Sequence, residues 1–379
     1  MKPFNYYNPV NIIFGNKQSA IGDILKADGH KKILLTYGKS SIKKTGLYDE
    51  ICEALNKAGI EFVEHSGISS NPLLSHAREG VQKAKGTSAI LAVGGGSVVD
   101  ESKAIAAAGG SGLDVWELYE GKEVSAALSL YVILTLSATG SEMNCGAVLT
   151  NEQTKEKLSF GTPLVYPKVS IVNPALTFTL PENYLVYSAV DTIAHVIEGY
   201  FTAEEHPTLI NRFCENIIKS VIETTEKILK NPKDLDARSE FALCSTWALN
   251  GLSVLGTGGG RFPNHMIEHS LSAIYNVPHG AGLAVVIPAW LKWFYKNTKN
   301  AQVVRFAKEI FGKDNADEGI SALEAWFVKI GAPVTLRELD IDKNDIDKIV
   351  KNVVSVAPRW GLGETYTPQA LKEILTLAI

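Results

Sequence analysis

Several features that mark other protein classes are scarce in this 379-residue sequence. It has four cysteines and no C-x-x-C pair, so a zinc–thiolate site, an iron–sulfur cluster and a disulfide framework are not indicated. No stretch approaches twenty consecutive apolar residues, and the N-terminus lacks the apolar core of a secretory signal. A formal net charge of −4 gives no basic field for nucleic acid or an anionic membrane. We therefore expect a cytoplasmic protein whose partner is a small molecule.

What is present is an ordinary globular composition, long enough for two domains. In the first part, short β-rich runs alternate with helical patterns, as in KKILLTYG before LYDEICEALNKAG and SAILAV before SVVDESKAIAAAG. Such alternation is typical of βαβ units and a parallel sheet. After LPENY the segments read as helices, and strands become hard to find. The sequence therefore predicts an α/β domain with a parallel sheet over residues 1–180 and an all-α domain over residues 181–379.

One glycine-rich segment, VGGGSVVDESKAIA, follows a predicted strand and opens a predicted helix. In that position, backbone N–H groups and the helix dipole can hold a phosphate. Gly94, Gly95 and Gly96 would allow a close approach of the anion, and Ser97 offers a hydroxyl. The segment matches neither G-x-G-x-x-G nor the P-loop, so an ordinary tight turn is the alternative.

A second loop of this kind follows an earlier strand, in LLTYGKSSIKKTG. Gly38 and Ser40 are small donors, and Lys39 adds positive charge. The alternative is a solvated turn whose lysines have no ligand. Two such loops at strand ends in one α/β domain favour a dinucleotide, which needs two anchoring points.

Two windows in the second half have the spacing of a metal site carried on helices. Asp191 and His195 lie in DTIAHVIEGY, and His265, His269 and His279 lie in HMIEHSLSAIYNVPHG. Residues four apart face the same side of a helix, so each pair can direct two donors at one ion. Aspartate with histidine suits divalent iron or zinc. The alternative is a set of hydrogen-bonded core histidines, and spacing alone does not separate His265 from His269 as a ligand.

Four segments, in this order, resemble the iron-containing alcohol dehydrogenase family, in particular its butanol dehydrogenase-like branch: GGGSVVDESKAIA, LTLSATGSEMNCGAVLTNEQTKEKLSF, DTIAHVIEGY and HMIEHSLSAIYNVPHGAGLAVVIPAW. The resemblance implies the dehydroquinate synthase-like fold, with a dinucleotide-binding α/β domain and a helical domain. It implies a divalent metal, Fe²⁺ ahead of Zn²⁺, bound by Asp191, His195, His265 and His279. It sets His269 beside the metal, where an imidazole can carry a proton.

The same resemblance implies contacts with the cofactor and a homodimer or larger assembly. The implied cofactor contacts are Gly95, Gly96, Ser97 and Asp100 at the pyrophosphate and nicotinamide ribose, Thr135, Thr139 and Lys157 further along, and Asn71 near the adenosine. Many members read P-T-T-x-G-T where this chain has TLSATG, so Leu136 and Ala138 depart from the commoner pattern.

These features together predict an NAD(P)-linked alcohol dehydrogenase or aldehyde reductase that acts on a small uncharged primary alcohol or aldehyde such as butanol or butanal. The alternatives are a glycerol dehydrogenase, a glycerol-phosphate dehydrogenase or a dehydroquinate synthase-like enzyme, or a non-catalytic metal- or nucleotide-binding protein. Near the metal windows Arg261 is basic, whereas the following neighbours are apolar or aromatic: Phe262, Met266, Ile267, Leu271 and Tyr275. NADP(H) is preferred to NAD(H) in this prediction, because the strand end TYGKSS has no acidic residue before Asp49.

Overall fold

The chain folds into two compact units, and the computed structural model describes every residue of both. The N-terminal unit is Tyr7–Leu180, and the helical unit is Pro181–Ile379 together with Met1–Tyr6. The expected first domain began at residue 1, but the first six residues belong with the helical unit, where the N–H of Lys2 donates to the carbonyl of Gly256 at 2.8 Å. None of the helices combines the length and the apolar character that a membrane crossing requires.

The N-terminal unit is built on a six-stranded sheet with the order β1-β8-β5-β4-β2-β3, in which every pair is parallel. The strands are β1 (Asn11–Phe14), β2 (Lys32–Tyr37), β3 (Glu61–Ser66), β4 (Ala89–Gly94), β5 (Ser129–Leu134) and β8 (Val169–Val172). Strands β2, β4 and β5 are nearly continuous apolar runs because helices cover both of their faces. The predicted parallel sheet is confirmed. Its order reverses between β2 and β4, which is where such sheets bind their ligands.

Helices on the two faces of this sheet complete the N-terminal unit. They are α1 (Ile21–Ala27), α2 (Ser41–Lys44), α3 (Leu47–Ala58), α4 (Leu74–Lys83), α5 (Gly96–Ser111) and α6 (Val115–Tyr119). Helices α1 and α3 share a core with one face, whereas α5 packs against β4 and β5 on the other and α4 packs beside it. A hairpin that the sequence did not predict, β6 (Gly146–Asn151) with β7 (Glu156–Gly161), pairs outside the sheet and packs on α5.

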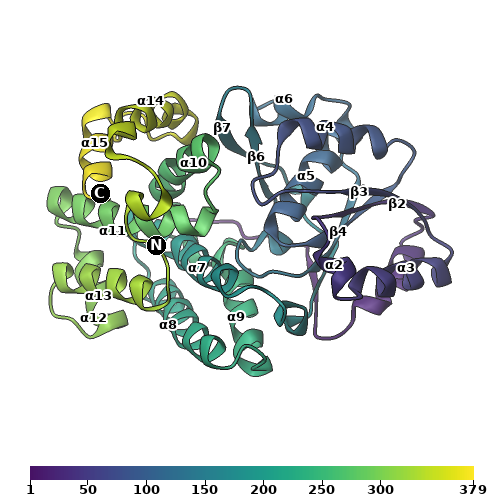
Figure 1. Cartoon of the computed structure of the whole chain (residues 1–379), viewed down its shortest axis with the longest axis horizontal. Helices are drawn as coiled ribbons and strands as arrows, with labels where there is room; N and C mark the ends of the chain where they lie inside the picture. The colour runs from purple at the N-terminus through teal and green to yellow at the C-terminus, as the bar shows by residue number, and fades with distance from the viewer. The chain divides into compact units, whose positions relative to one another are not determined.

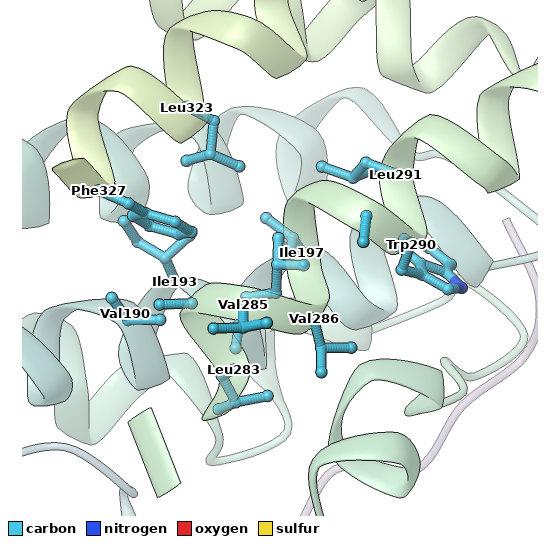
Figure 2. Packing of buried hydrophobic residues seen from close by; sticks show 14 of the residues in the cluster. Val190, Ile193, Ile197, Leu283, Val285, Val286, Trp290, Leu291, Leu323 and Phe327 are labelled. Atoms are coloured by element: carbon cyan, nitrogen blue, oxygen red, sulfur yellow. The ribbon is translucent and has the colours of Figure 1, made fainter. Parts of the chain in front are cut away.

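The helical unit surrounds two buried helices, α7 and α11. Its helices are α7 (Glu182–Thr202), α8 (Thr208–Lys230), α9 (Leu235–Ala248), α10 (Pro263–Tyr275), α11 (His279–Thr298), α12 (Ala301–Phe311), α13 (Ala316–Lys329), α14 (Ile346–Val356) and α15 (Pro368–Thr376), with a short 3₁₀ turn, η8, at Ala357–Trp360 (Figure 1). Ile193 and Ile197 of α7, Leu283 and Trp290 of α11 and Phe327 of α13 lie together without solvent contact (Figure 2). Helices α7 and α11 are apolar on most sides because neighbours enclose them. The predicted all-α character of this half is confirmed.

Candidate metal centre and nucleotide-binding loops

The four predicted metal ligands converge in the helical unit. The Nε2 atoms of His195, His265 and His279 lie 3.6, 3.6 and 3.5 Å from Oδ1 of Asp191. These separations exceed a hydrogen bond, and Oδ1 of Asp191 and Nε2 of His265 are buried without a hydrogen-bond partner. Tetrahedral ligands about 2.0–2.2 Å from one ion are about 3.4 Å apart. The spacing and the donor types therefore fit a divalent ion such as Fe²⁺ or Zn²⁺.

Three helices supply these ligands near their ends or along one face. Asp191 and His195 are one turn apart on α7, His265 is in the first turn of α10, and His279 is the first residue of α11. Helix α11 can approach α10 because Gly282 has no side chain: a Cβ there would lie 2.7 Å from a side-chain carbon of Glu268 on α10.

Two buried carboxylates orient these ligands, and the sequence analysis did not identify them. Oε1 of Glu198 accepts from the backbone N–H of His265 at 2.9 Å and lies 3.0 Å from its Nδ1. Glu268 forms the corresponding bond with Nδ1 of His279. A carboxylate that accepts from Nδ1 leaves the Nε2 lone pair for the ion. The repeated pattern H-x-I-E, in HVIE and HMIE, was the available signal.

Burial and neighbouring charges shift the proton equilibria of the cluster. Burial alone would raise the pKa of Asp191, but the surrounding imidazoles outweigh burial and hold this pKa below its usual value. Burial lowers the pKa of His195 to about 3, which leaves its ring neutral. Burial opposes protonation of His265 too, but Asp191 and Glu198 prevail and raise its pKa to about 9. The site favours positive charge at its centre, and a divalent cation would supply it.

His269 lies one turn beyond His265 and is buried beside the four ligands. Its ring centroid is 5.5 Å from that of His279 and 5.1 Å from that of Trp360 in η8, which it meets edge to face. This position agrees with a residue beside the ion. Its role as a proton carrier stays a prediction.

The apolar neighbours that the sequence analysis grouped together have different surroundings. Met266, Ile267 and Leu271 belong to the hydrophobic core of the helical unit, so they do not bear on the substrate. Phe262 packs its ring 5.5 Å from that of His265, and Arg261 donates to the carbonyl of Gly361 at 2.5 Å. Phe262 and Trp360 are therefore the apolar side chains that pack on imidazoles of the candidate site, and Trp360 was not identified from the sequence.

In the N-terminal unit, the glycine triplet joins β4 directly to α5. Gly94 ends β4 and its carbonyl accepts from the N–H of Thr135 at 3.0 Å, while Gly95 precedes the first helical residue, Gly96. A Cβ on Gly96 would lie 2.2 Å from Oγ1 of Thr139, so glycine allows this close packing. The first N–H groups of α5 have no partner within the helix, as a phosphate site requires.

Further predicted cofactor residues lie near the start of α5. The hydroxyl of Ser97 donates to the carbonyl of Ser70 at 2.6 Å, and the Lys157 ammonium donates to Oδ1 of Asn71 at 3.2 Å. Asn71 and Lys157, far apart in sequence, thus meet, and their contact with the cofactor stays a prediction.

Asp100 is already engaged within the protein. Its two oxygens accept from the hydroxyl of Ser141 at 2.5 Å and from the N–H of Val148 at 3.0 Å. Lys103, one turn later and fully buried, donates to Ser141, Asn144 and the carbonyl of Gly146 at 2.8–2.9 Å. Burial lowers the pKa of Lys103 to about 8. Both side chains hold the segment after β5, and a direct contact of Asp100 with cofactor stays a prediction.

Strand β2 is the neighbour of β4 in the sheet, so the loop after β2 follows a strand adjacent to the one that leads into α5. The carbonyl of Gly38 accepts from the N–H of Gly67 at 2.9 Å, and the side chains of Lys39 and Ser40 are exposed. Lys43, by contrast, lies 3.8 Å from a carboxylate oxygen of Glu64 and over the ring of Tyr48. Lys39 and Lys44 have no such carboxylate partner, and Lys39 is the nearer of the two to the end of β2.

Comparison with known proteins covers nearly the whole chain. The family model described as iron-containing alcohol dehydrogenase matches residues 9–174, and the C-terminal model of the Fe-containing alcohol dehydrogenase family matches residues 185–378. The probable NADH-dependent butanol dehydrogenase 1 of Bacillus subtilis is 40% identical over 94% of each chain. The NADPH-dependent aldehyde reductase YqhD of Escherichia coli is 35% identical over 93% of each chain. The crystal structure of NADH-dependent butanol dehydrogenase A from Thermotoga maritima has a TM-score of 0.96 and 43% identity, covering 100% of this chain and 99% of that one.

Proposed function

Because this chain belongs to the iron-containing alcohol dehydrogenase family, we propose that it is a metal-dependent alcohol dehydrogenase or aldehyde reductase linked to NAD(P)(H). Its substrate in this proposal is a small uncharged primary alcohol or aldehyde, such as butanol or butanal. The observation that carries the proposal is the buried, unpartnered Oδ1 of Asp191 with three imidazole nitrogens 3.5–3.6 Å away.

The roles in this proposal follow from the positions of the side chains. Asp191, His195, His265 and His279 hold Fe²⁺, with Zn²⁺ as the other ion that suits these donors. When bound, the ion supplies Lewis acidity toward the alcohol or carbonyl oxygen, and the nicotinamide supplies hydride exchange at the substrate carbon. His269 moves a proton between the substrate oxygen and solvent, since an imidazole titrates near neutral pH.

We assign the dinucleotide to the loops at the carboxyl ends of β2 and β4. The N–H groups of Gly95 and Gly96 and the hydroxyl of Ser97 receive the pyrophosphate, with Thr135, Thr139, Asn71 and Lys157 along the rest of the cofactor. What supports this assignment is that both loops lie where the strand order reverses.

We propose that NADP(H) is preferred to NAD(H). No acidic residue follows β2 directly, and Lys39 and Ser40 are exposed there, where they suit a 2′-phosphate. A charge-assisted contact contributes about 1.5–3 kcal/mol, or about ten- to a hundredfold in affinity. The relatives named above include both NADH- and NADPH-dependent enzymes, so the ratio of kcat/KM for NADPH and NADH with one aldehyde decides the preference. A ratio in favour of NADH contradicts it, and Lys39→Ala should lower a ratio that favours NADPH.

Phe262 and Trp360 support an uncharged substrate, because their rings pack on His265 and His269. We expect butanal to react well and glycerol or a glycerol phosphate poorly. The test is an alcohol and aldehyde panel with NADH and NADPH on protein of defined metal content. Absence of turnover with every aldehyde, in protein that holds its ion and binds cofactor, contradicts the proposal.

We also propose that the protein works in the cytoplasm as a homodimer or larger assembly. All four cysteines are free, which suits a reducing compartment. Light scattering after size exclusion, which gives the mass in solution, tests the assembly.

A further inference from the structure

A second cluster of imidazoles around a carboxylate lies in the N-terminal unit and has no part in the function proposed above. Glu101 in the second turn of α5 is fully buried, and its Oε1 is 2.9 Å from Nε2 of His65 on β3 and 2.6 Å from Nδ1 of His76 on α4. The centroids of the two imidazole rings are 4.2 Å apart, and the ring planes are tilted by 30°. These are hydrogen-bond distances, shorter than the 3.5–3.6 Å between the candidate metal ligands, so hydrogen bonds connect the members of this cluster.

The hydrogen bonds determine where those protons are. Nε2 of His76 lies 3.1 Å from the backbone carbonyl oxygen of Ser66, which only accepts, so Nε2 carries a hydrogen. Nδ1 of the same ring faces Glu101, and because a carboxylic acid is stronger than an imidazolium, the shared proton resides on Nδ1. His76 is therefore an imidazolium that balances the buried charge of Glu101. The hydrogen bond to Glu101 also raises the pKa of His76.

Other charged groups around His76 leave this assignment intact. The titratable groups nearby are Glu79 on α4, His65 on β3, Glu101 on α5, Tyr119 on α6, the Arg78–Asp114 ion pair, and Glu152 in the β6–β7 turn, which accepts from the N–H of Ser75. Arg78 is held by two hydrogen bonds to Asp114. Glu79 raises the pKa of His76 further.

A hydrogen bond from the cluster connects the two ends of the loop that joins β3 to α4. Ser66 precedes this loop and His76 follows it, and the two are joined by the bond from Nε2 (Figure 1 shows β3, α4 and α5). Between them, Ser70 accepts from Ser97 in the first turn of α5, and Asn71 accepts from Lys157. The loop thus carries one residue assigned to the dinucleotide and contacts two others.

We propose that His76 is a positioning residue whose imidazolium ties Glu101 to the backbone of Ser66 and so holds the loop with Asn71 in place for the dinucleotide. The inference rests on the proposed function in that this loop meets the cofactor. When His76 loses its proton, either Ser66 or Glu101 faces a bare nitrogen lone pair. One of the two hydrogen bonds of His76 is then lost, and cofactor binding weakens as the pH rises, while the four candidate metal ligands are unaffected.

Two measurements on the full-length holoenzyme test this inference. The first is the ¹⁵N spectrum of labelled histidines, with the His76 signals identified by their loss in His76→Gln. We expect both ring nitrogens to be protonated at pH 6 and to titrate above 6.5, the ordinary value. A His76 with a single protonated nitrogen at pH 6 overturns the inference, whether or not the enzyme turns over.

The second measurement is the dissociation constant of NADH by fluorescence titration between pH 6 and 9, with NADH chosen because it lacks a titrating 2′-phosphate. In wild type we expect it to rise roughly tenfold across the titration of His76. His76→Gln should be weak at every pH and lack this rise, with kcat for butanal nearly unchanged, whereas the control His206→Gln should follow wild type. Parallel curves for wild type and His76→Gln overturn the positioning role.

If wild type binds NADH and shows the expected pH dependence but reduces no aldehyde, the proposed function fails and the positioning role stands. Absence of NADH binding at any pH overturns both.

Discussion

The two units each gather imidazoles around a single carboxylate oxygen, but they hold them at different distances. In the helical unit the nitrogens lie 3.5–3.6 Å from Oδ1 of Asp191, and that oxygen has no hydrogen-bond partner. In the N-terminal unit they lie 2.6–2.9 Å from Oε1 of Glu101. The same residue types therefore have the spacing of candidate ion ligands in one place and of a hydrogen-bonded cluster in the other.

The largest difference should come from removing one imidazole from each cluster. His195→Ala should lose the ion and, with it, activity toward butanal by about a thousandfold or more, because the charge that stabilises the substrate oxygen is gone. The matched variant His76→Ala should retain the full metal content. Elemental analysis and a butanal assay check both, and loss of the ion from His76→Ala would break the comparison.

His269→Asn should come next, with kcat lower by about 10² to 10⁴ and the ion still bound. The asparagine cannot exchange a proton near neutral pH, but it leaves the four ligands in place. Steady-state kinetics and metal analysis on the same sample decide it. A variant without its ion would show that His269 had been wrongly separated from the ligands.

The carboxylates behind the imidazoles sharpen the comparison further. Glu198→Gln should weaken metal binding by about 10- to 100-fold, because the amide no longer holds His265 with its Nε2 lone pair toward the ion. Glu101→Gln is the matched control and should leave metal affinity unchanged. Competition with a chelator measures both affinities, and equal losses in the two variants would contradict the separate roles.

The smallest effect concerns the pH dependence of stability. The pKa of His76 is raised in the folded state, so its contribution is fully present below the unfolded value of 6.5 and is lost as the pH rises through the folded value. His76→Gln keeps one donor and should lower the free energy of unfolding by about 1 kcal/mol at pH 6. Urea unfolding at several pH values should show this difference shrinking as the pH rises above 6.5, and a difference that grows with pH would have the wrong sign.

Local patterns were sufficient to predict the two windows that carry the candidate ligands and the alternating half of the fold, but they did not separate His265 from His269. Asp191 and His195 are one helical turn apart, and the apolar runs KILLTY and AILAVG form the buried strands β2 and β4. The hairpin β6–β7 was not predicted, because its short strands, GAVLTN and EKLSFG, lack the long apolar run of β2 or β4. The role of Glu198 was missed because its partner His265 lies on another helix.

The Glu101 cluster was beyond sequence reasoning for a similar reason. His65 and Glu101 are 36 positions apart and His76 and Glu101 are 25 apart, and only the packing of β3, α4 and α5 brings them together. The resemblance named Asn71 and Lys157 as cofactor contacts, which spacing could not do. The structure brings these two side chains into contact, and their role at the cofactor stays a prediction.

The candidate ligands are distributed over α7, α10 and α11, so an ion bound there would cross-link distant parts of the chain. An ion that binds only the folded protein adds about 1.4 kcal/mol of stability for each tenfold excess over its dissociation constant. The melting temperature should therefore depend on the concentration of the free ion in the buffer as well as on the sequence. A chelator should lower the melting temperature before any residue is changed, and a preparation purified on a metal-stripping column should melt earlier than the same protein reloaded with its ion.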